Sequence, residues 1–375
     1  MTRIQSRIPT APIEQLVCHP NLPLAAGIEP DRPAVHIYDA SRNLREIGAV
    51  GTNSEEYGEE YPWSRKVPVL AWHPEQPELL VSVGNETVRW SPDGTSELSI
   101  GGYRYLAFSP DGQSLWASPG EPEGPFGMCV NSDVIDLGTG AKTSGWLWDT
   151  GVARHPAGGL VATLQSDQGA TTVYFSREGT RFRVLDRALI LDVDGYRLPV
   201  FSSAGRYLAV RGNSYENMVA VFEFPSLCRV LTTSLGGSVQ GWPQHNLAFG
   251  AQLWIGTPSG SLIELDVERG QAVEHELFGS AISALATTST GDLLVATGGE
   301  LALAPVPTAA ADPAIVADFL ASTTEIPDDA EPRDHLVQTD GVRTWRSGDL
   351  DEVTEATPSD PTWLQLQAVL NARRR

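Results

Sequence analysis

An apolar run, Leu106-Ala107-Phe108, leads into the turn Ser109-Pro110-Asp111-Gly112 and then into a second apolar run, Ser114-Leu115-Trp116-Ala117. Proline presets φ in such a turn, and glycine accepts a positive φ at no steric cost. Aromatic and aliphatic residues on both sides are typical of half-buried strands. The stretch therefore predicts two β-strands joined by a tight turn.

The same pattern recurs along the chain, each time followed by further strand-like runs. The copies are Leu16-Val17-Cys18-His19-Pro20, Leu70-Ala71-Trp72-His73-Pro74 and Val152-Ala153-Arg154-His155-Pro156, with weaker ones starting at Val200, Leu247 and Leu285. The positions equivalent to Pro110 are 20, 74, 110, 156, 203, 251 and 289, at intervals of 36 to 54 residues. A four-stranded propeller blade repeats every ~40–45 residues. Seven copies therefore predict an all-β fold, a seven-bladed β-propeller with a short C-terminal helical extension.

With this repeat, the chain resembles WD40 and related quinoprotein-like propellers over residues 3 to 306. The likeness is to architecture, because the Gly-His dipeptide of WD40 repeats is missing and Trp-Asp occurs only at Trp148-Asp149. The resemblance implies a ring in which the N-terminal strand often completes the last blade. Residues 3–8 alternate suitably for that role, and residues 341–346 are a rival. We expect a propeller over 1–306 and an extension over 307–375.

The extension has two helix start signals, Asp312-Pro313 and Asp360-Pro361, with Asp as N-cap and Pro at the first helical position. An acidic linker, residues 328–332, lies between them. The apolar residues that share one face of each predicted helix are Ile315, Val316, Phe319 and Leu320, then Trp363, Leu366 and Leu370. Either both helices pack on the propeller, or the last helix inserts into a groove of a partner.

The chain carries a net charge of −21, from 47 acidic and 26 basic residues. This charge argues against nucleic acid and against an anionic membrane, since both are bound mainly through Lys and Arg. It serves either solubility alone or the steering of a basic partner. The sequence shows no apolar secretion signal near the N-terminus and no run of the ~20 apolar residues that a membrane span requires. We therefore expect a cytoplasmic protein. The scarcity of lysine is typical of proteins encoded by GC-rich bacterial genomes.

Motifs for catalysis are weak. Residues 138–143 resemble a phosphate-binding loop, but Ala141 stands where that loop requires glycine, so a hairpin turn is expected. His19, His73 and His155 recur beside proline, which indicates a structural hydrogen bond to the turn in preference to a metal site. We expect no catalytic residue, cofactor or metal. The alternatives are a propeller enzyme with a metal in the central channel, acting as a lyase or hydrolase, and a propeller that binds a small ligand or glycan.

Two insertions point to a binding face, because their loops open on the same side of a propeller. One is the acidic and aromatic stretch 51–66 between blades one and two, and the other is 119–128 in blade three. Aromatic residues supply contact area and carboxylates supply steering, although a disordered acidic loop is the alternative. The candidate partner-binding residues are Glu55, Glu56, Tyr57, Glu59, Glu60, Tyr61, Trp63, Phe126, Trp363, Leu366 and Leu370. The sequence thus predicts a protein-interaction scaffold within a bacterial multi-protein complex.

Overall fold

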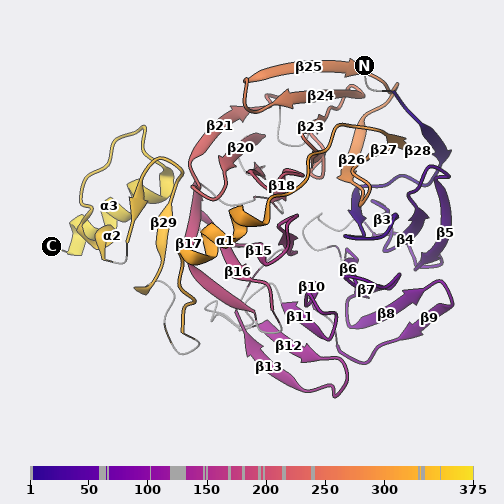
Figure 1. Cartoon of the computed structure of the whole chain (residues 1–375), viewed down its shortest axis with the longest axis horizontal. Helices are drawn as coiled ribbons and strands as arrows, with labels where there is room; N and C mark the ends of the chain where they lie inside the picture. The colour runs from indigo at the N-terminus through magenta and orange to yellow at the C-terminus, as the bar shows by residue number, and fades with distance from the viewer. Residues whose placement is uncertain are drawn as a thin grey trace.

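The computed structural model shows seven β-sheets arranged in a ring, with the C-terminal segment beside it (Figure 1). The seven-bladed propeller predicted from the seven positions equivalent to Pro110 is confirmed. The structure describes residues 3–374 except 59–64, 66, 102, 119–131, 147, 149–150, 168–169, 180–181, 193–195, 197–198, 213–216, 238–240, 328–329, 331–333 and 347.

Each blade contains four antiparallel strands in chain order, and blade 7 takes its fourth strand from the N-terminus. The first three blades are β2 (Gln15–Cys18), β3 (Leu24–Ile28), β4 (Val35–Asp39) and β5 (Arg45–Val50); β6 (Val69–Trp72), β7 (Leu79–Val83), β8 (Glu86–Ser91) and β9 (Gly94–Glu97); and β10 (Tyr105–Phe108), β11 (Ser114–Ser118), β12 (Ser132–Asp136) and β13 (Lys142–Gly145). Blades 4 and 5 are β14 (Ala153–Arg154), β15 (Leu160–Asp167), β16 (Ala170–Arg177) and β17 (Arg183–Asp192); and β18 (Val200–Phe201), β19 (Tyr207–Gly212), β20 (Met218–Glu223) and β21 (Arg229–Ser234). Blades 6 and 7 are β22 (Leu247–Phe249), β23 (Leu253–Gly256), β24 (Ser261–Asp266) and β25 (Gln271–Glu276); and β26 (Ile282–Thr287), β27 (Leu293–Thr297), β28 (Glu300–Ala304) and β1 (Ser6–Pro9).

Burial follows the position of a strand within its blade. The second strands β23 and β27 are buried along their whole length, which explains their continuous apolar sequences. The outer strand β9 is exposed at all four positions and has a polar sequence. Adjacent blades share apolar clusters, as where Trp72 and Trp90 of blade 2 pack with Ile37 of blade 1. The core is therefore a series of layers between blades, each sealed by its two neighbours.

The ring is closed by the N-terminal strand. β1 pairs antiparallel with β28, with Ser6 opposite Leu303 and Ile8 opposite Leu301. Of the two segments that the sequence offered for this role, the N-terminal one fills it. The rival segment forms part of a hairpin on blade 4. The predicted hairpin at 138–143 also forms, joining β12 to β13.

His19, His73 and His155 hydrogen-bond the turn between the first two strands of their own blades. Each of them also contacts the following blade of the ring. His155 is buried, its Nδ1 accepts the backbone N–H of Ala157 (3.2 Å), and its Nε2 lies 3.0 Å from the carbonyl oxygen of Gly205 in blade 5. His19 in blade 1 likewise accepts from Asn21 at Nδ1 (3.0 Å) and reaches the carbonyl of Gln76 in blade 2. Because Nδ1 is an acceptor, Nε2 carries the proton and donates. The predicted hydrogen bond to the turn is confirmed.

These histidines predict that stability falls on mild acidification. Burial lowers the pKa of His155, more than its hydrogen bond to the Gly205 carbonyl raises it, and burial also lowers the pKa of His19 and His73. The unfolded chain then binds more protons than the native chain below the ordinary histidine pKa of ~6.5. We expect the free energy of unfolding to be about 1–3 kcal/mol lower at pH 5.5 than at pH 7.5 through these three groups.

The measurement compares denaturant unfolding of the wild type and His155→Asn at both pH values. Asparagine can accept from the turn but does not titrate, so the variant should lose less stability on acidification. The exposed His335, changed to Asn, is the control and should keep the wild-type difference. The titration of His36 changes stability in the opposite direction. Burial lowers its pKa, but hydrogen bonds with Glu29 and Glu46 outweigh burial and raise it above the ordinary value. His36 is present in the wild type and in both variants, so its contribution cancels in the comparison. If His155→Asn lost as much stability between the two pH values as the wild type, the prediction would be contradicted.

After blade 7 the chain runs back across the turns of earlier blades. The backbone N–H of Ala251 in blade 6 donates to the Pro307 carbonyl (3.0 Å), and the N–H of Ala309 donates to Ser203 Oγ in blade 5 (3.0 Å). Helix α1 (Pro313–Ala321) then packs on blades 4 and 5 through Val316 and Phe319, and the carboxylate of Asp312 caps it as predicted. The chain ends with β29 (Val337–Thr339), β30 (Thr344–Trp345), α2 (Asp349–Glu352) and α3 (Thr362–Arg374). In the described part of the chain, no helix is both long and apolar enough to cross a lipid bilayer.

Candidate functional site

The outer strand of blade 4 supports the C-terminal unit, which we define as residues 337–374. β17 is ten residues long, and its first half hydrogen-bonds residues 324–326, through the Asp186 N–H to the Thr324 carbonyl (2.9 Å). Its second half pairs in parallel with β29, with Arg187 opposite Val337. β30 then pairs with β29, so that the sheet of blade 4 has six strands. Along this stretch the extension covers a sheet edge that would otherwise be open to pairing.

The turn between β29 and β30 is fixed by Asp340. Its carboxylate accepts the backbone N–H groups of Val342 (2.8 Å) and Arg343 (2.7 Å) and forms an ion pair with the Arg343 guanidinium (3.1 Å). Gly341 has a φ of +86°, and a Cβ there would lie 2.5 Å from Cβ of Arg229 in blade 5. Its carbonyl accepts the N–H of Arg229 (2.8 Å). The turn thus joins the C-terminal unit to a second blade.

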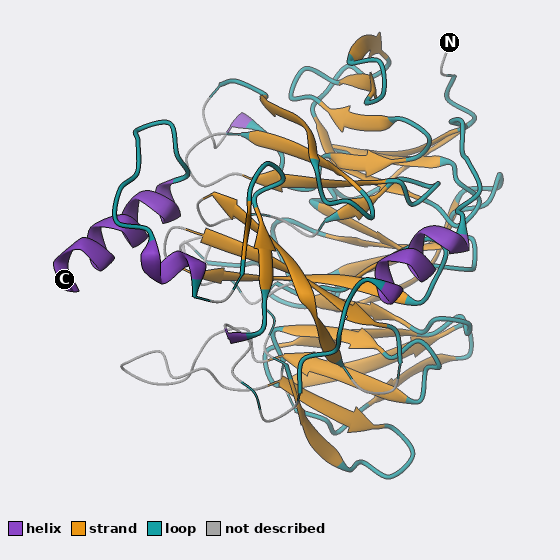
Figure 2. Cartoon of the chain, turned by 60° about the vertical axis from the view of Figure 1, so that its left-hand side comes forward, coloured by secondary structure: helices purple, strands orange, loops and turns teal. Residues whose placement is uncertain are grey.

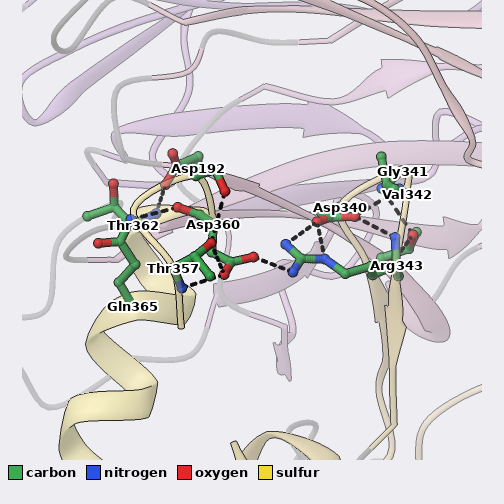
Figure 3. A network of polar contacts seen from close by, with 11 residues as sticks. Asp192, Asp340, Gly341, Val342, Arg343, Thr357, Asp360, Thr362 and Gln365 are labelled. Atoms are coloured by element: carbon green, nitrogen blue, oxygen red, sulfur yellow. Dashed lines mark hydrogen bonds and ion pairs between the residues drawn. The ribbon is translucent and has the colours of Figure 1, made fainter. Parts of the chain in front are cut away.

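Asp360 links the turn to the start of α3 (Figure 3). Its carboxylate accepts the N–H (2.7 Å) and hydroxyl (2.8 Å) of Thr357 and binds Arg343 at 2.6 Å. These hydrogen bonds, from Thr357 first and then Arg343, lower the pKa of Asp360 to about 2. The sequence predicted Asp360 as the N-cap of this helix. The first helical N–H, at Thr362, instead donates to Asp192 of β17 (2.7 Å), because Thr357 and Arg343 already occupy the Asp360 carboxylate.

A cleft of about 410 Å³ opens where these groups meet blades 4 and 5. It is lined by Asp192, Arg229, Asp340, Val342, Arg343, Ser359, Asp360 and Pro361. The carboxylates of Asp192, Asp340 and Asp360 each accept hydrogen bonds from the C-terminal unit. We call this hydrogen-bonded network the polar joint, and its members are Asp192, Asp340, Arg343, Thr357, Asp360 and Thr362. Its chemistry holds the start of α3 against the propeller.

An apolar contact completes the attachment of α3. Trp363 and Trp345 meet edge to face, with ring centroids 5.0 Å apart, and both pack with Ile190 of β17. On the same face of the helix, the Asn371 amide donates to the carbonyls of Leu350 (2.6 Å) and Val353 (2.8 Å). One face of α3 is therefore fully engaged with the rest of the chain.

The opposite face of α3 is apolar and open to solvent. Leu366 and Val369 are each 50% exposed and Leu370 is 51% exposed, and we call these three residues the α3 stripe. Arg373 and Arg374 follow in the last turn and are also exposed. Figure 2 shows α3 outside the strands of the ring, with the C-terminus directed away from it. The helix thus presents its stripe at the rim of the propeller.

The predicted acidic loop is partly tied to its own blade. The N–H of Tyr57 donates to the Asp31 carbonyl (2.7 Å), and Glu56 forms an ion pair with Arg32 (2.9 Å) while its side chain stays 68% exposed. The Arg65 guanidinium lies over the Tyr57 ring, 5.6 Å from its centroid. Glu55 is exposed and forms no ion pair within the described residues. The first part of the loop is therefore ordered against the turn between β3 and β4.

That turn leads inward to a histidine that the sequence did not single out. His36 is buried, with Nε2 2.8 Å from Glu29 and Nδ1 3.1 Å from Glu46. Glu29 also binds Arg32 (3.3 Å), which holds Glu56 of the loop. A chain of ion pairs thus connects the buried histidine to the loop. The sequence offered no motif for this cluster, because His36 and Glu46 lie ten residues apart.

The structure does not bring all the predicted binding residues together. Glu55, Glu56 and Tyr57 lie beside blade 1, whereas Trp363, Leu366 and Leu370 lie on α3 beside blade 4. Trp363 is buried in the anchor, and the prediction missed Val369, although its spacing from Leu366 and Leu370 fits one helix face. In the described part of the chain, no three His, Cys, Asp or Glu side chains are arranged to hold a metal. The predicted residues outside the described part are Glu59, Glu60, Tyr61, Trp63 and Phe126.

Comparison with known proteins bears on the fold. No protein-family model matches the chain, and no curated protein matches it. Among solved structures, it is similar to the β-propeller domain of Cps50 (Swd1) from Myceliophteria thermophila. The two are 12% identical, the match covers 82% of this chain and 100% of that one, and the TM-score is 0.56. This likeness supports the β-propeller fold, whose seven blades the sheet topology shows.

Proposed function

We propose that this chain is a non-catalytic, protein-binding platform that works within a multi-protein complex in the bacterial cytoplasm. The observation that carries the proposal is the α3 stripe, whose three aliphatic side chains are half exposed on one helix face. Single exposed apolar residues are common, whereas a contiguous group marks a contact surface. The polar joint and the tryptophan anchor fix the helix in place, so the surface is presented before any partner arrives.

The loop around Glu55 is the second proposed contact, for a basic segment of a partner. It supplies exposed carboxylates on a chain of net charge −21, which favours association with positive charge. The ordered backbone of Tyr57 keeps these carboxylates at a fixed place beside blade 1. Such charges act mainly on the rate of association.

The primary test is affinity purification of the tagged chain from its native source at low salt. We expect at least one other protein to be retained in stoichiometric amount. Recovery of the chain alone would contradict the proposal. Stoichiometric divalent metal together with metal-dependent turnover in the purified protein would replace it with an enzymatic function.

The loop gives a further prediction, made on the purified partner. Glu55→Gln with Glu56→Gln should slow association about 3- to 10-fold at low salt, with a smaller effect at high salt, because exposed charges are screened. Stopped-flow or surface-plasmon measurements at several salt concentrations would record this. Glu274→Gln with Glu276→Gln, on the exposed outer strand of blade 6, is the matched control. Equal effects of the two pairs would show that net charge alone matters and that the loop is not a contact.

A further inference from the structure

We propose that α3 binds an apolar groove on a different protein, and that carboxylates at one end of this groove bind Arg373 and Arg374. The inference rests on the proposed function and names the chemistry of its partner. It assigns to α3 a partner surface of opposite charge to the one proposed for the loop at Glu55.

The first step is the geometry of the helix. Leu366, Val369, Leu370 and Arg373 follow the spacing i, i+3, i+4 and i+7, which places them along one face. With a rise of ~1.5 Å per residue, the row from Leu366 to Arg373 is ~10 Å long. The residues buried against the chain itself centre on the other side, and they are Leu364, Ala368 and Asn371, with Trp363 buried at the border beside Leu370. The propeller cannot cover the α3 stripe without giving up this anchor.

The second step is the charge at the end of the row. Arg373 and Arg374 are exposed, and neither forms an ion pair with any residue that the structure describes. Arg343 of the same unit differs from them, because its guanidinium is paired with Asp360 at 2.6 Å. Two unpaired guanidinium groups beside an apolar row fit carboxylates that border a groove. They are the part of the surface that an acidic partner recognises.

A second copy of this chain is a poor occupant of the α3 stripe. Each copy carries a charge of −21, which opposes self-association. An antiparallel pair of α3 helices would set Arg373 against the start of the other helix. The carboxylates there are already engaged, Asp360 with Arg343 and Thr357, and Asp192 with the N–H of Thr362. A parallel pair would set the arginines side by side.

An anionic membrane is also a poor occupant. The described face of α3 offers three aliphatic residues and no exposed aromatic residue, whereas interfacial helices combine a larger apolar face with basic residues. The neighbouring helix α2 adds exposed acids at Asp349, Asp351 and Glu352. It packs beside Asn371, on the side of α3 away from the stripe. An extended anionic surface would meet these acids as well as the two arginines, whereas a protein groove needs to contact only the face of α3 that carries the stripe.

The experiment places a photo-cross-linking amino acid, p-benzoylphenylalanine, at Val369 in the full chain, in cells of the native source. Val273, a 54% exposed valine on the outer strand of blade 6, is the control position. We expect a cross-link to another protein from position 369 and none from 273. The cross-linked protein is then identified and purified, and its affinity for the chain is measured.

Binding by that purified partner is the decisive readout. Leu366→Asp with Leu370→Asp should weaken it ~30-fold or more, because both side chains enter the centre of the contact. Arg373→Glu with Arg374→Glu should weaken it ~10-fold at low salt and flatten its salt dependence. Val273→Asp should leave the affinity unchanged. Thermal unfolding of every variant checks that the fold is intact, as expected for exposed positions.

Other outcomes overturn the inference. A cross-linked dimer of the chain that Leu366→Asp abolishes assigns the stripe to a second copy, and a cross-link to lipid assigns it to a membrane. No specific cross-link from 369, or an affinity that ignores the α3 variants, removes α3 as a contact. If affinity purification still recovers a partner in that case, the proposed function stands and only this inference fails. If no partner is recovered at all, both fail.

Discussion

Replacing Arg211 with methionine is expected to lower the free energy of unfolding by about 3–5 kcal/mol. Arg211 lies in β19 and is only 2% exposed. Its guanidinium donates to the amide oxygens of Asn246 (3.1 Å) and Asn217 (3.0 Å) and to the carbonyl of Gly212 (2.6 Å). Methionine fills a similar volume but leaves these buried acceptors without their donor, and each such loss costs about 1–3 kcal/mol.

Chemical unfolding followed by intrinsic tryptophan fluorescence would measure the effect. Arg211→Lys should fall between the wild type and Arg211→Met, because an ammonium group cannot reproduce the planar set of donors. Arg269→Met is the matched control, since that side chain is 75% exposed, and its unfolding free energy should change by less than about 0.5 kcal/mol. A loss of less than about 1 kcal/mol in Arg211→Met would mean that the cluster is dispensable.

Deleting residues 2–9 is expected to cost about 3–6 kcal/mol and to make the protein self-associate. The deletion removes β1, and with it the four residue pairs that close blade 7. It also removes the contact of Ile8 with the cluster between blades 7 and 1, and it leaves β28 as an open edge. An open edge offers unpaired N–H and C=O groups to other chains.

Thermal unfolding and light scattering over a range of protein concentrations would record both effects. Deleting only residues 2–3 keeps β1 and is the control. If the longer deletion behaves like the shorter one, closure of the ring does not depend on the N-terminal strand.

The ring was predictable because the information for each blade is local. Ser109-Pro110-Asp111-Gly112 and the histidine turns contain their own turn chemistry, and the strands on either side lie within a few residues of them. Even the role of His155 could be predicted, since it recurs at the same place in the repeat as His19 and His73. Local signals repeated seven times add to a strong prediction.

The attachment of the C-terminal unit was not predictable in the same way. β29 has three residues, and it pairs with Arg187–Leu189, which lie about 150 residues earlier in the chain. No local pattern encodes that pairing. Asp360 shows a related limit, because its sequence context is that of a helix cap. Its carboxylate is taken by Arg343, which only the folded turn at Asp340 brings within reach.

The candidate site lay between these two cases. Helical periodicity placed Trp363, Leu366 and Leu370 on one side of α3, within an arc of about 60°. The structure divides this arc, because Trp363 packs on Trp345 while the two leucines face solvent. Which part of a continuous apolar arc meets the propeller depends on the angle at which the helix docks. The polar joint sets that angle, and it is assembled from three separate segments, at Asp192, at 340–343 and at 357–362.

The return path of the chain after blade 7 makes the two halves of the ring mechanically unequal. Residues 307–316 contact the turns of blades 6 and 5 and reach Gly159 in blade 4, where a Cβ would lie 3.3 Å from Val316. Separating blades 4, 5 and 6 therefore requires this segment to be peeled off as well, whereas within the described residues blades 1 to 3 are joined by blade packing and their turns. A mechanical load applied through α3 would act first on blades 4 to 6, which are held both by blade packing and by residues 307–316. The ring is then expected to open among blades 1 to 3, on the side away from the proposed contact at α3.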